Sequence, residues 1–336
     1  MTAAVDAVGF DDELAALDDV LDRFETSDDA DVARVGHVAV VSDPFGGRET
    51  VLDYAATRAT DVARSSLSPA TDGVTLDGSS TVAVLDDCHH LFTRQIGGFD
   101  RLDQFLDEVV AFDGLVVSSW NRFAWDYLDA VKGIGRSFPN LIAVSPLSEA
   151  ELRSSLTDER SGSLPRFVPT ARENREQPFR WTSRTVGLWG DRTVTLSLPT
   201  PNAEYVHHRL GRREPEVLED VVFGRLTRLS DGNPGVARDL WDRTVDGGEL
   251  RLDDLEAPVE TLDVDDLTGY VLALVVTKER LDRAELDAVV DDPVLDRSLG
   301  SLADAGVVDV DGTAVALTPV GLRPGVEYLQ RRRLLW

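Results

Sequence analysis

A glycine turn, an acidic pair and a polar strand end in the first half of the chain together suit phosphate chemistry. The stretch VVSDPFGGRET, residues 40–50, joins an apolar run to a helical pattern. A strand, a glycine turn and a helix start can bind a phosphate group, because backbone N–H groups and a helix N-terminus favour anions. A decayed phosphate loop and an ordinary turn are the alternatives.

The glycine turn departs from the full motif, G-x-x-x-x-G-K-[ST]. Arg48 stands at the lysine and Glu49 at the Ser/Thr position, with Thr50 one residue later. Arg48 keeps a positive charge but is a bulkier, forked group, and Glu49 puts an anion where a hydroxyl should hold Mg²⁺. We interpret the stretch as a decayed phosphate loop, whose predicted contact residues are Gly46, Gly47, Arg48, Glu49 and Thr50.

Two further strand ends carry polar residues. Asp86 and Asp87 end the apolar run TVAVLDD, where a P-loop ATPase holds Mg²⁺ with one carboxylate and orients the attacking water with the next. Asn121 ends GLVVSSWN, where a sensor of the γ-phosphate would lie. The alternatives are a chance acidic pair in an acidic chain and an ordinary helix cap at Asn121.

Strand and helix patterns alternate over the first 150 residues. Apolar runs predict strands at residues 35–42, 61–68, 81–87, 114–121 and 140–147, and amphipathic patterns predict helices at 11–25, 48–59, 99–112 and 122–131. Strands alternating with helices indicate a parallel sheet covered on both faces. The pattern therefore predicts an α/β fold with a parallel sheet, and with the glycine turn and the acidic pair described above this sheet resembles that of a P-loop NTPase-like fold.

The rest of the chain divides into three parts. A polar stretch and a hairpin with Gly190-Asp191 at its turn suggest an insertion, and helical patterns with a start at Pro234 suggest a lid. Three helices, a hairpin turning at Asp311-Gly312 and a closing helix at 324–336 predict a winged helix-turn-helix. The predicted domains are 1–156 (α/β), 157–201 (insertion with β-hairpin), 202–248 (helical lid) and 262–336 (winged helix).

The acidic composition says more about the salt content of the surrounding solvent than about a binding partner. The net charge is −27 and is spread along the chain, and Lys132 and Lys278 are its two lysines. This composition is similar to that of haloarchaeal proteins. Cys88 is the one cysteine, so there is no internal disulfide. Residues 1–20 lack a signal-peptide pattern and no apolar run reaches 18 residues, so we predict a cytoplasmic protein.

The order of these elements resembles the AAA+ and related signal-transduction (STAND-like) ATPases, including archaeal origin-recognition initiators. VGFDDELAALDDVL resembles the box beside adenine, in which Gly9, Glu13 and Leu14 match while Phe10 replaces an arginine. LSDGNPGVARDLW resembles the start of the lid helix, from which Arg238 would face the phosphates.

The resemblance implies ATP and Mg²⁺ as cofactors. Asp87 would be catalytic, Asp86 and Thr50 would hold the metal, and nucleotide would contact Gly9, Asn121 and Arg238 beside the loop. It implies a nucleotide-responsive regulator whose ATP hydrolysis is weak or lost, since Arg48, Glu49 and Asp87 depart from the family pattern. The alternative is a non-catalytic scaffold or adaptor that binds DNA or protein through its winged helix. The sequence does not name the partner or the oligomeric state.

Other polar and aromatic residues have structural interpretations. His89-His90 and His207-His208 lack further ligands at metal spacing, and Cys88 and Trp120 suit core packing. The predicted recognition helix, residues 292–306, carries Arg297 and several acids, which suits phosphate contact poorly. The tail holds three consecutive arginines at 331–333, so a DNA role would use the tail and the wing.

The composition predicts a strong dependence of stability on salt. When KCl is lowered from molar to about 0.1 M, the Debye length rises from about 3 Å to about 10 Å and the acidic surface repels itself. We expect the melting temperature to fall, as measured by circular dichroism. Equal melting temperatures at both salt concentrations would reject the halophilic interpretation.

Overall fold

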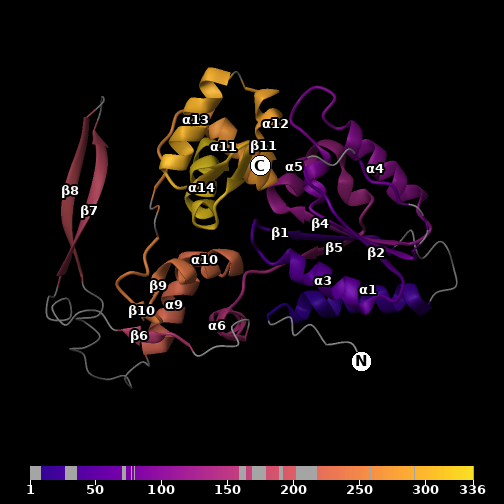
Figure 1. The fold of residues 1–336 in the computed structure, drawn as a ribbon, viewed down its shortest axis with the longest axis horizontal. Helices are drawn as coiled ribbons and strands as arrows, with labels where there is room; N and C mark the ends of the chain where they lie inside the picture. The colour runs from indigo at the N-terminus through magenta and orange to yellow at the C-terminus, as the bar shows by residue number, and fades with distance from the viewer. Residues whose placement is uncertain are drawn as a thin grey trace.

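The chain folds around one parallel sheet, to which a lid and a winged helix are joined (Figure 1). The computed structural model describes residues 9–26, 36–69, 73–76, 78, 80–158, 164–168, 179–188, 192–201, 218–257, 259, 261–290 and 292–335. The predicted hairpin turn at Gly190-Asp191 and the pair His207-His208 lie outside these residues.

The sheet has five parallel strands in the order β2-β3-β4-β1-β5. Their bounds are β1 Val38–Ser42, β2 Val62–Ser66, β3 Val82–Asp86, β4 Leu115–Asn121 and β5 Asn140–Ala143. Every residue of β1, β3 and β4 is buried, as the continuous apolar runs predict for a sheet covered on both faces. Because the strands are parallel, the residues after β1, β3 and β4 meet at one edge of the sheet.

Helices cover both faces of the sheet. Two apolar clusters pack against its two sides: one includes Leu17 of α1 and Leu52 of α3, and the other includes Phe105 of α4 and Trp125 of α5. The helix bounds are α1 Asp11–Thr26, α3 Arg48–Arg58, α4 Asp100–Ala111 and α5 Arg122–Lys132. The short helix η1, Cys88–Leu91, follows β3, and η2, Ile134–Arg136, follows α5.

The lid consists of helices with a small sheet. Its helices are α6 Glu149–Asp158, α9 Leu218–Ser230 and α10 Pro234–Thr244. The start of α10 at Pro234 is confirmed, with Asn233 as N-cap accepting from the N–H of Val236. Strand β10 Glu249–Arg251 pairs with β9 Val245–Asp246 on one side and with β6 Arg166–Val168 on the other, and β6 is a strand that the sequence patterns did not predict.

A separate hairpin stands beside the lid in Figure 1. It pairs β7 Phe179–Leu188 with β8 Arg192–Pro201, ten residues on each strand. The alternating pattern of the predicted insertion therefore forms the expected hairpin.

The winged helix has the predicted helices and one additional strand. The elements are α11 Asp266–Lys278, α12 Arg283–Asp287, α13 Asp292–Asp304, β12 Val308–Asp311, β13 Ala314–Leu317 and α14 Pro319–Arg332. The additional strand is β11 Arg280–Asp282, which pairs with β13. The predicted start of the closing helix at residue 324 was wrong. The helix begins at Pro319 because Thr318 caps it through the N–H of Gly321, and Pro324 lies inside it.

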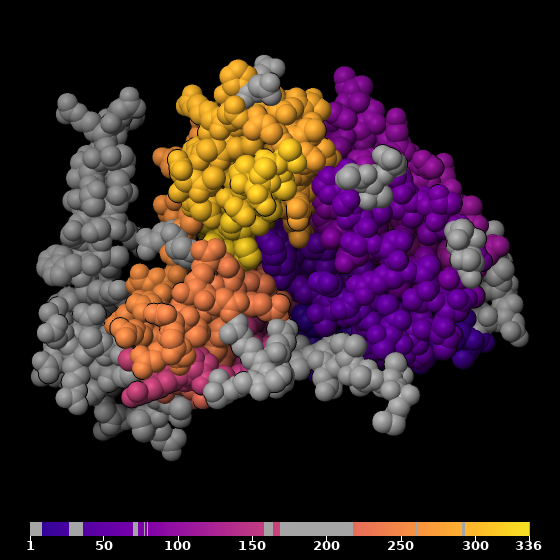
Figure 2. Space-filling view, viewed as in Figure 1, coloured from indigo at the N-terminus to yellow at the C-terminus, as the bar shows by residue number. Residues whose placement is uncertain are grey.

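The winged helix and the lid both contact the α/β domain (Figure 2), through Glu279 on Arg48 and through Asn233 on Pro44. Helix α11 is buried along nearly its whole length, from Thr268 to Lys278. Arg323 of α14 donates to the carbonyl of Arg228 in the lid, so the winged helix contacts both other parts. Over the described residues, no helix is long and apolar enough to span a membrane.

Candidate functional site

The glycine turn after β1 has the backbone of a tight loop. Phe45 and Gly47 have positive φ values of 63° and 93°, and the N–H of Gly46 donates to the carbonyl of Asp43 at 2.9 Å. A methyl group at Gly47 would overlap the ring of Phe10, which explains the glycine there. No side chain caps the first turn of α3, so this helix N-terminus can attract an anion.

The loop is hydrogen-bonded directly to the lid. Asn233 donates its Nδ2 to the carbonyl of Pro44 at 2.8 Å, and the N–H of Gly235 donates to the carbonyl of Phe45 at 3.1 Å. The Cα of Gly235 packs so close to Phe45 that an added Cβ would lie 2.5 Å from its side chain. These contacts hold the lid directly against the loop.

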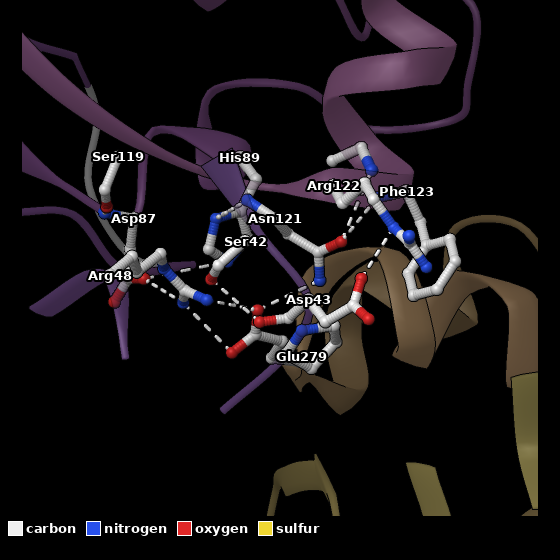
Figure 3. A network of polar contacts seen from close by, with 12 residues as sticks. Ser42, Asp43, Arg48, Asp87, His89, Ser119, Asn121, Arg122, Phe123 and Glu279 are labelled. Carbon is white, nitrogen blue, oxygen red and sulfur yellow. Dashed lines mark hydrogen bonds and ion pairs between the residues drawn. The ribbon is translucent and has the colours of Figure 1, made fainter. Parts of the chain in front are cut away.

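Arg48 lies at the centre of a buried ion-pair network (Figure 3). Its side chain binds Glu279 with two parallel bonds, Nη1 to Oε1 at 2.8 Å and Nη2 to Oε2 at 3.0 Å. The same Nη2 donates to Oδ1 of Asp87 at 2.6 Å. Two carboxylates from different domains thus share one guanidinium, and Glu279 comes from the end of α11 in the winged helix.

Asn121 joins the same network and caps a helix as well. Its Oδ1 accepts from the N–H of Phe123 at 2.9 Å, so the cap interpretation holds. Its Nδ2 donates to the carbonyl of Val276 at 2.8 Å and to Oε1 of Glu279 at 3.0 Å. We call Arg48, Asp87, Asn121 and Glu279 the Arg48 network.

The acidic pair after β3 is divided between two roles. Asp86 is buried and accepts through Oδ1 from the hydroxyl of Ser119 and from the N–H of Asp87. Asp87 has a positive φ of 59°, which turns its side chain toward Arg48. Ser119 thereby holds the carboxylate of Asp86 in position. The sequence placed Ser119 near the end of a neighbouring strand but gave no sign of this hydrogen bond.

Burial and ion pairing act in opposite directions on the pKa values of Arg48 and Asp87. Burial acts to lower the pKa of Arg48, but the attraction of Glu279 and Asp87 outweighs it and raises that pKa above its usual value. Burial raises the pKa of Asp87 to about 6, although Arg48 acts to lower it. Burial also holds the pKa of His89 well below its usual range, so this imidazole stays neutral beside the network.

The other predicted site residues lie around the network without joining it. Glu49 is exposed in the first turn of α3, and the N–H of Thr50 donates to the carbonyl of Gly47 at 3.1 Å. Gly9 packs against Leu147 of the segment before α6. Arg238 is exposed on α10, so its reach to a phosphate stays a prediction.

The described residues do not fit a bound Mg²⁺-nucleotide in this conformation. The carboxylate of Glu279 binds both Nη atoms of Arg48, and the carboxylates of Asp87 and Asp86 lie beside it, so a phosphate group at Arg48 would meet like charges. Like charges in a buried site repel strongly. Among the described residues, no group of three or more His, Cys, Asp or Glu side chains could hold a metal ion.

A cavity of about 470 Å³ adjoins the loop. Asp43 and Arg122 form an ion pair at 2.6 Å on its wall. The other walls come from β5, from the start of α10 and from α14, so three parts of the chain enclose it. Space for a small molecule therefore remains beside the loop.

Glu279 is the functional residue that the sequence patterns missed. It lies 231 positions from Arg48, so no local spacing connects the two. The available signal was the apolar character of residues 270–276 on every side of the helix, which indicates burial on all faces. Charged residues directly after such a helix must lie at an interface and need partners.

Cys88, Trp120 and the pair His89-His90 are all buried. Cys88 is fully buried, and burial raises the pKa of its thiol. Trp120 packs edge-on against Trp125 with ring centroids 5.7 Å apart. His89 and His90 are buried neighbours with centroids 4.6 Å apart.

Comparisons with known proteins give distant matches among solved structures only. No family model matches the chain, and no curated protein matches it. Among solved structures, a K64R mutant of Thermotoga maritima RuvB is 14% identical, with 97% of this chain and 95% of that chain covered and a TM-score of 0.41. The Aeropyrum pernix ORC1 protein in complex with DNA is 12% identical, with 98% and 94% covered and a TM-score of 0.38. Cdc6p from Pyrobaculum aerophilum is 13% identical, with 96% and 94% covered and a TM-score of 0.37. Likenesses of this size do not place the chain in a family.

The raised pKa of Asp87 predicts a pH-dependent effect of Asp87→Asn. The folded state binds a proton with a pKa of about 6, whereas the ordinary value is 3.8, so the contribution of Asp87 to stability falls as pH rises through this window. Relative to the wild type, Asp87→Asn should gain stability from pH 4 to pH 6, by at most about 3 kcal/mol. Urea denaturation across this range measures the difference. The control is Asp107→Asn at an exposed position, and a pH-independent difference for Asp87→Asn would contradict the assignment.

Proposed function

We propose that this chain is a non-catalytic regulatory scaffold with a P-loop NTPase-like fold, in which an internal ion pair replaces nucleotide. The observation that carries this proposal is the bidentate contact of Glu279 with Arg48. In this proposal the contact keeps the winged helix docked on the α/β domain. The protein then binds its partner through a preformed arrangement of lid and winged helix.

The energetics of the network support permanent docking. Arg48 is 9% exposed, and the side chain of Glu279 is 14% exposed. Removing one partner of a buried, hydrogen-bonded pair costs about 3–5 kcal/mol, because the other charge is left buried and uncompensated. Arg48 and Glu279 therefore stabilise the docked state only together.

The chemistry of the site also argues against turnover. Asp87, the residue predicted to orient a water, has its carboxylate bound to Arg48. Glu49 adds an anion at the start of α3, where a hydroxyl would bind the metal. With both roles lost, the loop keeps the shape of a phosphate site without its ligands.

The winged helix favours a protein partner over DNA. Among the described residues on the exposed side of α13 and on the wing, Arg297 is accompanied by Asp296, Asp304, Asp309 and Asp311. DNA affinity depends on cations that replace condensed counterions, so an acidic recognition helix is unsuited to a phosphate backbone. Helix α13 also lies on the side of the winged helix away from the α/β domain (Figure 1).

Glu279→Gln tests the docking. The substitution keeps the shape of the side chain but removes its charge, so Arg48 loses its bidentate partner. We expect a loss of stability of about 3 kcal/mol, and faster hydrogen exchange at the end of α11 and in β11. Glu256→Gln is the control, since this carboxylate is 57% exposed in a surface pair with Arg225.

Titration with Mg²⁺-ATP in molar KCl tests the scaffold itself. We expect no saturable binding to the wild type and the same exchange pattern in residues 266–332 with and without nucleotide. A change in that exchange pattern at saturating ATP would overturn the proposal, because it would show that nucleotide moves the winged helix.

A second candidate is a nucleotide-responsive regulator, and one observation favours it. Arg48 stands at an uncapped helix N-terminus beside a cavity that reaches Ser42, Asp43 and Gly46 of the loop. In this reading ATP displaces Glu279 and frees the winged helix. Mg²⁺-ATP binding by Glu279→Gln, together with a changed exchange pattern of the wild type, would favour it over the scaffold.

Duplex DNA binding checks the choice of partner. Since the recognition face is acidic, we expect no saturable binding of a random duplex at about 0.2 M KCl, measured by fluorescence anisotropy. Replacing the three arginines at 331–333 by glutamine should leave this result unchanged. Saturable binding with a steep salt dependence, lost in the triple variant, would assign DNA binding to the tail.

A further inference from the structure

A second charged cluster lies where η1 and its following loop meet the winged helix. It contains His90, Arg94, Arg101, Lys278, Arg280 and Glu285, which we call the cationic seam. Lys278 directly precedes Glu279, but the cationic seam uses different residues from the Arg48 network. Arg94, Arg101, Lys278 and Arg280 bring four cationic side chains to this cluster, in a chain whose net charge is −27.

Lys278 is the most unusual member. It is 3% exposed, and its Nζ makes no hydrogen bond to any described residue. The ammonium lies 4.6 Å from the ring centroid of Phe92, which gives it a cation–π contact but no acceptor. Burial, followed by the charges of Arg101 and Arg94, lowers the pKa of Lys278 to about 7, while Glu285 acts to raise it.

Arg94 presents one edge of its guanidinium without a partner. Its Nε and Nη2 are buried and make no hydrogen bonds within the described part of the chain. These two nitrogens lie on the same edge and donate in parallel, which is the geometry that binds two oxygens of one oxyanion. The face of the guanidinium rests on Tyr127 at 4.5 Å, which holds it in position.

His90 and Glu285 complete the surroundings. His90 is 5% exposed, and its Nδ1 has no hydrogen-bond partner among the described residues. Burial, with the charges of Lys278, Arg48, Arg101 and Arg280, lowers its pKa to about 3, so the imidazole is neutral. Glu285 uses Oε2 to accept from the N–H of Asp282, and its Oε1 has no described partner.

Buried donors without acceptors need an explanation, because a buried donor that is left unpaired loses its hydrogen bonds to water without gaining any in return. Water could satisfy one or two of them but would not offset the positive charges of Arg94 and Lys278. An oxyanion satisfies both, since it offers several acceptor lone pairs and negative charge. The paired donors of Arg94 favour an oxyanion over a halide ion, which has no second oxygen to receive them.

We propose that the cationic seam is a binding site for a phosphate-class oxyanion, held by Arg94 of the α/β domain and Lys278 of the winged helix. The bound oxyanion bridges the two domains independently of the Arg48 network. It stabilises their docked arrangement by mass action, because it binds both sides of the seam.

Calorimetric titration of inorganic phosphate in molar KCl, without ATP, tests the site. We expect one saturable site in the wild type, weakened about tenfold or more by Arg94→Met or Lys278→Met, since each removes charged hydrogen bonds. Glu285→Gln should tighten binding, because it removes the competing carboxylate. Arg297→Met is the control for lost positive charge, since Arg297 is 82% exposed on α13.

Three further outcomes decide the assignment. Absence of saturable binding in the wild type overturns it, and so does equal binding by the wild type, Arg94→Met and Lys278→Met. If Arg48→Met abolishes phosphate binding while Arg94→Met does not, the oxyanion binds at α3, which overturns this site and also weakens the scaffold proposal.

A parallel titration with glycerol phosphate distinguishes the chemical form of the natural ligand. Equal affinity for the two compounds indicates a phosphate group on a larger molecule, and weaker affinity for glycerol phosphate indicates the free ion. Either result is consistent with the site.

Discussion

A guanidinium buried at the carboxyl edge of a parallel sheet must be neutralised, and this requirement organises the molecule. Arg48 is held at that edge by the first turn of α3, with two sheet strands ending beside it. Asp87 supplies one carboxylate from the α/β domain, but burial raises the pKa of that group. Glu279 supplies the second carboxylate, and it can do so only if the winged helix is docked. The position of a whole domain is thereby coupled to the charge of one side chain.

The same contacts explain how the lid is held. Asn233 and the N–H of Gly235 bind carbonyls of the loop that precedes Arg48. Arg323 then connects α14 to the end of α9. The loop, the lid and the winged helix each contact the other two, so separating any one of them exposes polar groups of its neighbours. Such mutual contacts suit a protein whose domains keep one relative arrangement.

Charge is distributed unevenly between the surface and the interior seams. The surface is acidic, and in dilute buffer it repels itself. Where the winged helix meets the α/β domain, buried cations gather instead, Arg48 on one side and Lys278 with Arg94 on the other. In the Arg48 network, carboxylates of the chain itself neutralise the buried cation. The cationic seam includes the carboxylate of Glu285, but the donors of Arg94 and Lys278 make no hydrogen bonds within the described part of the chain.

The sequence by itself determined that helices cover both faces of a parallel sheet, and which edge of that sheet carries the polar residues. Apolar runs placed β1, β3 and β4, and strand parallelism then required Arg48, Asp87 and Asn121 to meet. The helical and hairpin patterns of the winged helix were equally local, although the three-residue strands β6 and β11 were too short to show a pattern. The start of α14 was misplaced because Pro324 was read as a helix start, whereas Thr318 supplies the cap.

Only the tertiary structure decided what neutralises the loop. Periodicity reports which face of an element is buried, but it carries no information about which distant element covers it. Glu279 lies 231 positions from Arg48 and follows an apolar helix, so its sequence context marks it as buried without naming a partner. The same holds for Lys278 and Arg94, whose burial and unpaired donors arise where two domains meet. A phosphate loop and a loop that binds a carboxylate of its own chain differ in this one long-range contact, and local sequence cannot distinguish them.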